Sequence, residues 1–285
     1  MLVILMLIAA ALVSGCGGGE DPAEPTFDGV AVEDPGPIHV HGLGINPRDG
    51  ALFIATHTGL FRVPPGEEEA IRVADRYQDT MGFTVVGSDR FLGSGHPDTR
   101  EDLPPYLGLI QSDDAGESWQ PVSLVGDADF HVLEAQDDRV YGFGSDWESR
   151  KPQFLVSSDG GESWEERGFP EPLVSLAVHP SDAERIVASG ASAVHVSRDG
   201  GRTWRRVSSP AGFVAWRSPS ELIMVGADGG VGASSDGRSW QVVGDVGGRP
   251  AAFEAEDEEL YVALHDGTIK RSNDGGRSWS VRSRP

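Results

Sequence analysis

The 285-residue sequence predicts an all-β fold built from repeated sheets, and three observations support this prediction. The pattern Ser-x-Asp-x-Gly-x-Ser/Thr-Trp occurs four times, and a copy shortened by one residue occurs once. Apolar runs rich in β-branched residues flank the copies, as expected for strands. The closing tryptophans are 45, 40, 36 and 39 residues apart, a regular period that is typical of propellers and solenoids. They are Trp119, Trp164, Trp204, Trp240 and Trp279.

Each copy of the motif predicts a hairpin turn between two strands. The Asp carboxylate can accept hydrogen bonds from turn amides, and the Gly can adopt a positive φ that a residue with a Cβ resists. The Trp opens the following strand, where its large ring can fill the gap to a neighbouring sheet. The motif aspartates are therefore expected to be structural, and they are Asp114, Asp159, Asp199, Asp236 and Asp274.

The motif resembles the Asp-box, or BNR, repeat of sialidase-like β-propellers. In overall plan, the chain is similar to bacterial lipoproteins labelled sialidase-like or glycosyl-hydrolase-like, because its repeats begin with His39-Val40-His41-Gly42-Leu43-Gly44. Sortilin-type receptors and photosystem II assembly factors also carry such repeats, and they bind partners rather than catalyse. The resemblance implies a propeller, and it leaves the function open because fold does not fix function.

Aligning the segments gives six repeats of four strands each, which predicts a six-bladed propeller over residues 38–285. The last repeat is the clearest, with expected strands at residues 250–256, 260–265, 268–273 and 278–283. The first repeat has Pro64-Pro65-Gly66 where the motif would stand. A seventh blade, completed by a strand at residues 27–32, remains an alternative.

The N-terminal residues predict a lipid anchor. Residues 1–15 are expected to be a lipoprotein signal peptide, because residues 1–14 are largely apolar and uncharged. This apolar run ends in Leu12-Val13-Ser14-Gly15-Cys16, which resembles a bacterial lipobox. Cys16 would carry the lipid, placing the protein outside the cytoplasm on the bacterial cell membrane. The alternative is a plain N-terminal anchor or a core strand. Residues 16–37 are rich in Gly, Pro and acidic residues, which predicts a flexible acidic tether.

Composition excludes some classes of partner. The chain has 45 acidic and 23 basic residues and a net charge of −22, which argues against binding nucleic acid or anionic lipid headgroups. Cys16 is the only cysteine, so a disulfide within the chain is excluded. Stability is therefore expected to come from burial and from closure of the ring.

The loops predict which face of the propeller binds a ligand. If the strands of a blade are lettered A to D from the axis outward, the motif turns join C to D on one face, the motif face. The B–C loops lie on the other, loop-rich face, and those at residues 96–106 and 145–153 are long and charged. The alternative is loop growth without a ligand. A protein or glycan partner is expected to use Tyr106 and Trp147 as aromatic anchors, and the candidate ligand-binding residues are Asp98, Tyr106, Asp129, Asp146 and Trp147.

Histidines gather on the same predicted face. They stand where A strands begin or B strands end, and two of them are two residues apart in one strand and so are expected to share a side of it. Converging imidazoles with a nearby carboxylate suit zinc, copper or iron. The alternative is that each is a hydrogen-bonded structural residue. The candidate metal ligands are His39, His41, His57, His96 and His131.

The resemblance to sialidases also implies a glycoside hydrolase, which we keep as the alternative function. Those enzymes use three arginines, a Tyr–Glu nucleophile and an Asp, and their first arginine lies in a Phe/Tyr-Arg-Ile-Pro motif. Here Phe61-Arg62-Val63-Pro64 is similar, but it is expected in a C strand away from the axis. If Tyr106 were the nucleophile, only Arg100 and Arg150 would be close enough in the sequence to be candidates for the three arginines. A hydrolase that uses two carboxylates also remains an alternative, because the loops carry several acidic residues. These are Asp98, Glu101, Asp146 and Glu148. We expect a binding protein.

Overall fold

The computed structural model describes residues 26–27, 30–31, 34–209 and 211–285. The predicted signal peptide of residues 1–15, Cys16 and most of the predicted tether lie outside these described residues. Contacts between residues divide the chain into residues 1–34 and residues 35–285. In the first unit, β1 (Thr26–Phe27) and β2 (Val30–Ala31) pair as a two-stranded antiparallel sheet. Among the described residues, no helix is long and apolar enough to cross a membrane.

Residues 35–285 form six four-stranded antiparallel sheets, the blades of a propeller. Blade one contains β3 (Val40–Ile45), β4 (Leu52–Thr56), β5 (Gly59–Val63) and β6 (Ile71–Arg72). Blade two contains β7 (Asp79–Gly87), β8 (Arg90–His96), β9 (Leu109–Ser112) and β10 (Gln120–Ser123). Blade three contains β11 (Ala128–Gln136), β12 (Arg139–Asp146), β13 (Pro152–Ser157) and β14 (Glu165–Arg167).

The second half of the ring repeats this plan. Blade four contains β15 (Leu173–His179), β16 (Asp182–Gly190), β17 (Val194–Ser197) and β18 (Arg205–Ser208). Blade five contains β19 (Gly212–Ser218), β20 (Glu221–Gly226), β21 (Gly230–Ser234) and β22 (Gln241–Asp245). Blade six contains β23 (Pro250–Glu256), β24 (Glu259–Leu264), β25 (Ile269–Ser272) and β26 (Ser280–Ser283).

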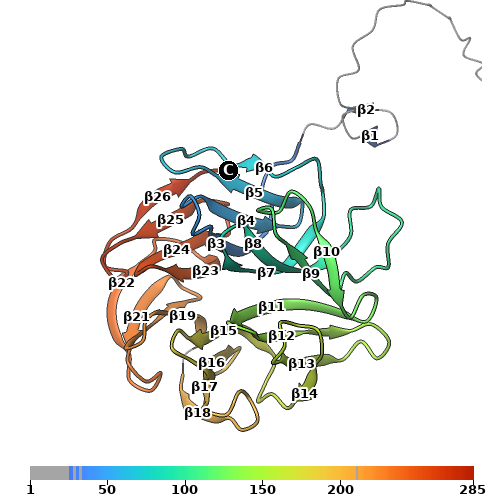
Figure 1. Ribbon diagram of the computed structural model, residues 1–285. Helices are drawn as coiled ribbons and strands as arrows, with labels where there is room; N and C mark the ends of the chain where they lie inside the picture. Colours follow the sequence, from blue (N-terminus) through green and yellow to red (C-terminus); the bar gives the residue numbers. More distant parts are fainter. Residues whose placement is uncertain (1–25, 28–29, 32–33, 210) are drawn as a thin grey trace, which may run out of the picture. The chain divides into compact units, whose positions relative to one another are not determined.

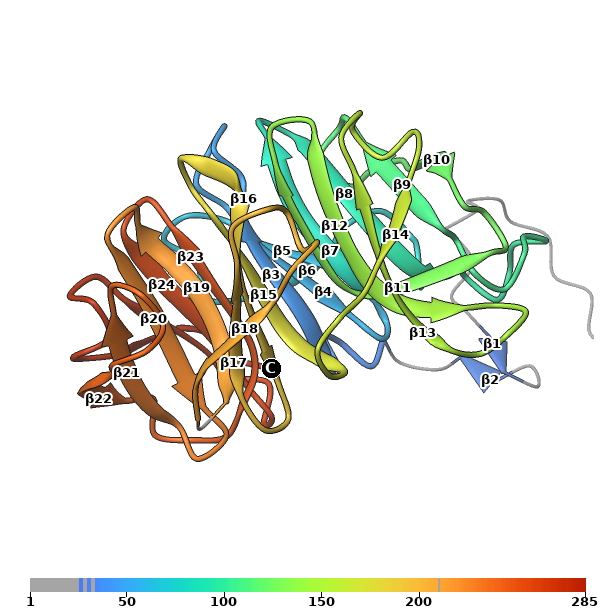
Figure 2. The same ribbon diagram turned by 90° about the horizontal axis from the view of Figure 1, so that it is seen from below.

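Within every blade the strands pair in chain order, and the first strand of each lies nearest the axis of the ring (Figure 1). In the view turned by 90°, the strands run between the two faces of the ring (Figure 2). The prediction of six four-stranded blades is therefore confirmed. The seven-blade alternative is not supported, because residues 26–27 pair with residues 30–31 in their own small sheet.

The hydrophobic core is divided into six clusters, one between each pair of neighbouring blades. Each sheet is covered by a blade on both sides, so consecutive residues of its second strand are buried rather than every other residue. β4 is an example, because all five of its residues are buried. Packing between blades, rather than within one blade, thus holds the ring together.

The motif turns combine hydrogen bonding with packing. In the copy ending at Trp204, Asp199 Oδ1 accepts a hydrogen bond from the amide of Thr203 (2.9 Å), and Oδ2 accepts one from its hydroxyl (2.6 Å). These bonds, with one from Ser197, lower the pKa of Asp199 to about 2. Asp114, Asp159 and Asp274 accept the same pair of bonds, and Asp236 in the shortened copy accepts from the amide of Arg238.

Each motif tryptophan packs in the interface with the preceding blade, beside the cluster there. The close approach needs a glycine, as at Gly161, which has a φ of +95°. A Cβ at this position would lie 2.1 Å from Cδ2 of Leu109 in blade two. The motif therefore fixes both the turn and the spacing between blades.

The B–C loops differ from the prediction at one of two places. The connection between β8 and β9 is long, as expected. The two strands extend into the segment at residues 145–153, because β12 continues to Asp146 and β13 begins at Pro152, which pairs with Ser145. Only five residues form this turn, so the expected long loop of blade three is a short hairpin that presents Trp147.

Candidate functional site

The structure brings the five predicted histidines to the loop-rich face of blades one to three. His39 precedes β3 and His41 lies in it, while His57 follows β4. His96 ends β8, and His131 lies near the start of β11. Two carboxylates stand among them, Asp79 at the start of β7 and Asp129 in β11. We call these seven residues the histidine cluster.

Three side chains of the cluster converge on one point. Nε2 of His41 is 3.2 Å from Nδ1 of His57, and that Nδ1 is 2.9 Å from Oδ1 of Asp79. The third separation, between Nε2 of His41 and Oδ1 of Asp79, is 3.7 Å. Among the described residues, this trio is the group of His, Cys, Asp and Glu side chains with ligand atoms close enough to share one metal ion.

A second chain of contacts leads away from the trio. Nδ1 of His96 lies 3.1 Å from Oδ2 of Asp79, on the carboxylate oxygen that does not face His57. Nε2 of His96 is 3.6 Å from Oδ2 of Asp129, which is 2.9 Å from Nε2 of His131. Oδ1 of Asp129 is buried and has no hydrogen-bond partner among the described residues. The second chain thus orients Asp79 through its outer oxygen.

His39 stands beside the trio without being part of it. Its ring centroid lies 5.6 Å from that of His57, and its φ is +53°. It precedes β3, and the strand has a register shift between Val40 and Gly42. The expectation that strand alternation places His39 and His41 on one side of a strand is therefore wrong. The two rings instead both lie beside the ring of His57.

The protonation states follow from burial and from the neighbouring charges. Burial lowers the pKa of His41 to about 4, with further lowering by the other histidines and an opposing contribution from Asp79. Burial would raise the pKa of Asp79, but hydrogen bonds and charge from His96, His57 and His41 outweigh it and leave the pKa below its usual value. At neutral pH, His41 is therefore neutral and Asp79 is ionised.

Asp79 is the residue of the trio that sequence reasoning missed. It opens the A strand of blade two, one residue before the register shift of that strand, and Asp129 holds the corresponding place in β11. The signal was therefore the repeat position itself rather than the residue type. Because every A strand begins on the loop-rich face, an inspection of the first residues of all six A strands would have identified Asp79.

The predicted ligand-binding residues divide into buried and exposed groups. Asp98 is only 2% exposed, and it accepts hydrogen bonds from the side chain and amide of Arg100 and the amide of Tyr77. Burial opposes this ionisation, yet those bonds lower the pKa of Asp98 to about 2. Asp98 thus holds its own loop together rather than facing a ligand. Asp129 is also buried, beneath His131.

The aromatic residues form a short row beside the cluster. Tyr106 is buried, with its ring 5.6 Å from that of His96 and 4.9 Å from that of Trp147. Trp147 is 38% exposed, and the guanidinium of Arg150 lies over it at 3.9 Å. Asp146 accepts a hydrogen bond from the amide of Ser149, so it stabilises the turn that carries Trp147. Trp147 is therefore the exposed aromatic contact, and Tyr106 supports it.

A cavity of about 450 Å³ adjoins the histidine cluster on the side of blade six. His39 and His41 line it, together with residues that include Phe213, Leu264 and His265. Imidazoles thus border a hollow of ligand size on a rigid scaffold, which is where small molecules usually bind.

The chain was compared with known proteins. No family model matches it, and no curated protein matches it. Among solved structures, it is similar to YCF48 from Cyanidioschyzon merolae, with 15% identity and a TM-score of 0.51 over 87% of this chain and 86% of that one. It is similar to a gluconolactonase from Xanthomonas campestris, with 14% identity and a TM-score of 0.62 over 86% of each chain.

A third similar structure is an ancestral GH74 enzyme, with 15% identity and a TM-score of 0.56 over 88% of this chain and 39% of that one. At these identities the likeness concerns the fold alone. The blades and the comparisons together define the class: this protein is a six-bladed β-propeller.

Proposed function

We propose that this propeller is a lipid-anchored, extracytoplasmic binding protein of the Asp-box type that holds a transition metal on its loop-rich face. The ligands are His41, His57 and Asp79. The lipid is attached at Cys16, and the tether carries the propeller away from the membrane.

The spacing of the three donor atoms carries this proposal. Two ligands of a tetrahedral zinc ion, each about 2.1 Å from the metal, are about 3.4 Å apart. The separations here are 3.2, 2.9 and 3.7 Å, which lie around that value. Both short separations end on Nδ1 of His57, which either donates or accepts a single hydrogen bond, so hydrogen bonding accounts for one of them but not for both. A shared ion accounts for all three.

The charges of the trio support the same conclusion. Metal binding needs a neutral imidazole and an ionised carboxylate. Burial keeps His41 neutral, because it lowers its pKa to about 4, and Asp79 has a pKa below its usual value. One carboxylate opposite a divalent ion also leaves a positive charge for an anionic or polar ligand to neutralise.

The residues around the trio suit a metal that keeps an open coordination position. Two imidazoles and one carboxylate are typical of zinc or iron(II) sites that leave room for water or a ligand. His96 holds the outer oxygen of Asp79, as outer-shell partners of metal ligands do. A protein or glycan partner that donates to the metal would also contact Trp147, which stands exposed at the end of the aromatic row.

The glycoside hydrolase alternative has less support. Arg62, in the segment similar to the sialidase motif, forms an ion pair of 2.7 Å with Asp49 on the motif face. Arg100 is paired with Asp98 and Asp75. The Tyr106 hydroxyl accepts a hydrogen bond from Arg150 and, among the described residues, contacts no carboxylate. The arginines and the tyrosine are therefore occupied in ways that do not form the sialidase arrangement.

Elemental analysis of the chain purified without chelator tests the metal proposal. We expect one zinc or iron ion per chain, and its loss in His57→Ala and Asp79→Asn. His265→Ala is the matched control, because this exposed histidine lies on the same face outside the trio. Stoichiometry that is unchanged in both trio variants would contradict the proposal.

Fractionation of the producing bacterium tests the anchor separately. The wild-type chain should be found in the membrane fraction, and Cys16→Ser should release it in soluble form. Equal membrane association of the two proteins would contradict lipid attachment at Cys16 and would leave the metal site untouched.

A further inference from the structure

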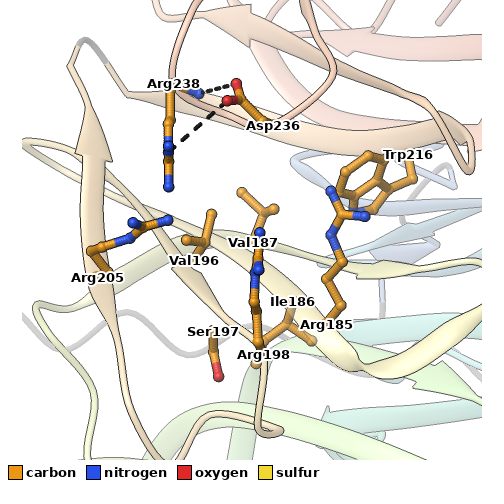
Figure 3. A pocket seen from close by; sticks show the side chains of 10 residues that line it. All are labelled: Arg185, Ile186, Val187, Val196, Ser197, Arg198, Arg205, Trp216, Asp236 and Arg238. Atoms are coloured by element: carbon orange, nitrogen blue, oxygen red, sulfur yellow. Dashed lines mark hydrogen bonds and ion pairs between the residues drawn. The ribbon is translucent and has the colours of Figure 1, made fainter.

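We infer that the groove between blades four and five, on the motif face, is a binding site for a compact dianionic oxyanion, such as phosphate or the phosphate group of a larger molecule. The groove encloses about 90 Å³, the space of about three liquid waters. Four arginines line it, together with Trp216 and Asp236 (Figure 3). They are Arg185, Arg198, Arg205 and Arg238.

The fold places these arginines together from separate elements. Arg198 and Arg238 stand in the motif turns of blades four and five, while Arg205 begins β18. Arg185 lies in β16, near the same face. In Figure 3 the guanidinium groups of Arg205 and Arg238 point toward a common space from two sides. This site is therefore on the face opposite the histidine cluster.

Three of the four arginines of the groove form no ion pair with a residue that the structure describes. The side chains of Arg198 and Arg205 form neither an ion pair nor a hydrogen bond with any residue that the structure describes. Asp236 is the one lining carboxylate, and its nearest guanidinium contact, with Nε of Arg238, is 3.9 Å. Acidic residues outnumber basic ones by 45 to 23 in the chain, so four arginines around one carboxylate depart from the composition elsewhere.

The groove is also partly preorganised. The guanidinium of Arg185 lies over the ring of Trp216 at 4.8 Å and donates to the carbonyl of Ser235 (3.4 Å). Buried and half-buried aliphatic side chains from β16 and β17 form the floor. Apolar walls strengthen the attraction between guanidinium groups and an anion, because they lower the local dielectric.

The number and directions of the arginines indicate the class of ligand. One arginine can match a carboxylate with two parallel hydrogen bonds. Guanidinium groups approaching from several sides instead suit a tetrahedral anion, which has oxygens on every side. With four cations and one carboxylate, the groove favours a dianion over a monoanion.

Calorimetric titration of inorganic phosphate into the full chain at low ionic strength tests the site. Arg205→Gln/Arg238→Gln should weaken binding by about tenfold or more, since charge-assisted contacts are lost. Arg206→Gln is the control for the loss of a single charge, because Arg206 is exposed on the same strand as Arg205 and lies outside the groove. Thermal unfolding of each variant establishes that the fold is kept.

The outcomes separate this site from a metal site. Binding that persists in His57→Ala and is lost in the double arginine variant supports the inference. No heat of binding in the wild-type chain, an equal loss in Arg206→Gln, or loss in His57→Ala alone would overturn it. An adventitious metal at the histidine cluster would give the last of these results.

A second titration distinguishes free phosphate from a phosphorylated ligand. Glycerol 3-phosphate that binds at least as tightly as inorganic phosphate would indicate a phosphomonoester reaching out of the groove. Much weaker binding of the ester would indicate that the groove accepts the free anion. A preference for acetate over both phosphates would overturn the assignment to a dianion.

Discussion

Arg282, in the last strand of the ring, donates a hydrogen bond of 3.0 Å to the carbonyl oxygen of Val63 in the first blade, 219 residues earlier in the chain. It also donates to the carbonyl of Pro64 at 2.9 Å, and Ser283 donates to the carbonyl of Glu68 at 2.6 Å. The other five blade interfaces each contain a motif tryptophan, but blade one has no motif. These polar contacts therefore reinforce the interface that closes the ring.

Replacing Arg282 by Ala should lower the free energy of unfolding by about 2 kcal/mol, because hydrogen bonds from a charged donor contribute about 1.5–3 kcal/mol. The midpoint of urea unfolding measures this change. Arg284→Ala is the control, since Arg284 is exposed one residue past the end of β26. Equal midpoints for the two variants would remove the special role of Arg282 in closure.

Ser123 links two neighbouring blades through Trp164. Nε1 of Trp164 donates to Ser123 Oγ at 2.9 Å, and that hydroxyl donates to the carbonyl of Gly161 at 2.5 Å. Ser123→Ala should cost about 1–3 kcal/mol, because it leaves a donor and an acceptor unpaired. In a double-mutant cycle with Trp164→Phe, the two costs should be less than additive by about 0.5 kcal/mol or more. Full additivity would show that the contact contributes nothing.

The propeller could be predicted because its signal is local and repeated. A turn with Asp and Gly in fixed positions needs no knowledge of distant residues, and the spacing of the tryptophans gives the size of a blade. The first blade, which has no motif, was placed by its strands alone. The contacts of Arg282 with it could not be predicted, because nothing in the local sequence relates residues 219 positions apart.

The site was harder to predict, because side-chain pairing decides it. The positions of the histidines followed from the ends of the strands, whereas Asp98 was misread because its partner, Arg100, lies in the same irregular loop. Sequence does not show whether a loop carboxylate faces a ligand or an arginine two residues away. Likewise, the register of β12 and β13 turned an expected loop at residues 145–153 into a hairpin.

His96 provides a test of how Asp79 is positioned. Its Nδ1 lies 3.1 Å from Oδ2 of Asp79, and this hydrogen bond raises the pKa of His96 above its usual value. His96→Ala should weaken zinc binding by about 10–100-fold without abolishing it, as expected for an outer-shell partner. Competition against a zinc-binding dye measures the affinity. Complete loss of stoichiometric binding would instead make His96 a ligand, and an unchanged affinity would show that Asp79 needs no such support.

Two glutamates inside the ring make the stability of the chain depend on pH. Glu134 of β11 and Glu254 of β23 line a narrow cavity on the inner strands, which His41 and His131 also line. Water reaches both carboxyls only partly, and protein surrounds them. Burial raises the pKa of Glu254 to about 8, and burial with the charge of Glu254 raises that of Glu134 well above its usual range.

Because the folded pKa of Glu254 exceeds the unfolded value of about 4.3, the folded chain binds more protons between these values, and stability should fall as pH rises from about 4 to about 8. Glu254→Gln should remove part of this decline. Relative to wild type, the variant should gain about 1 kcal/mol or more between pH 5 and pH 8.5, the equivalent of one pKa unit. Urea unfolding at both pH values measures it, with exposed Glu148→Gln as the control. A gain of the same size in the control would assign the effect to the net charge of −22 rather than to the buried carboxyl.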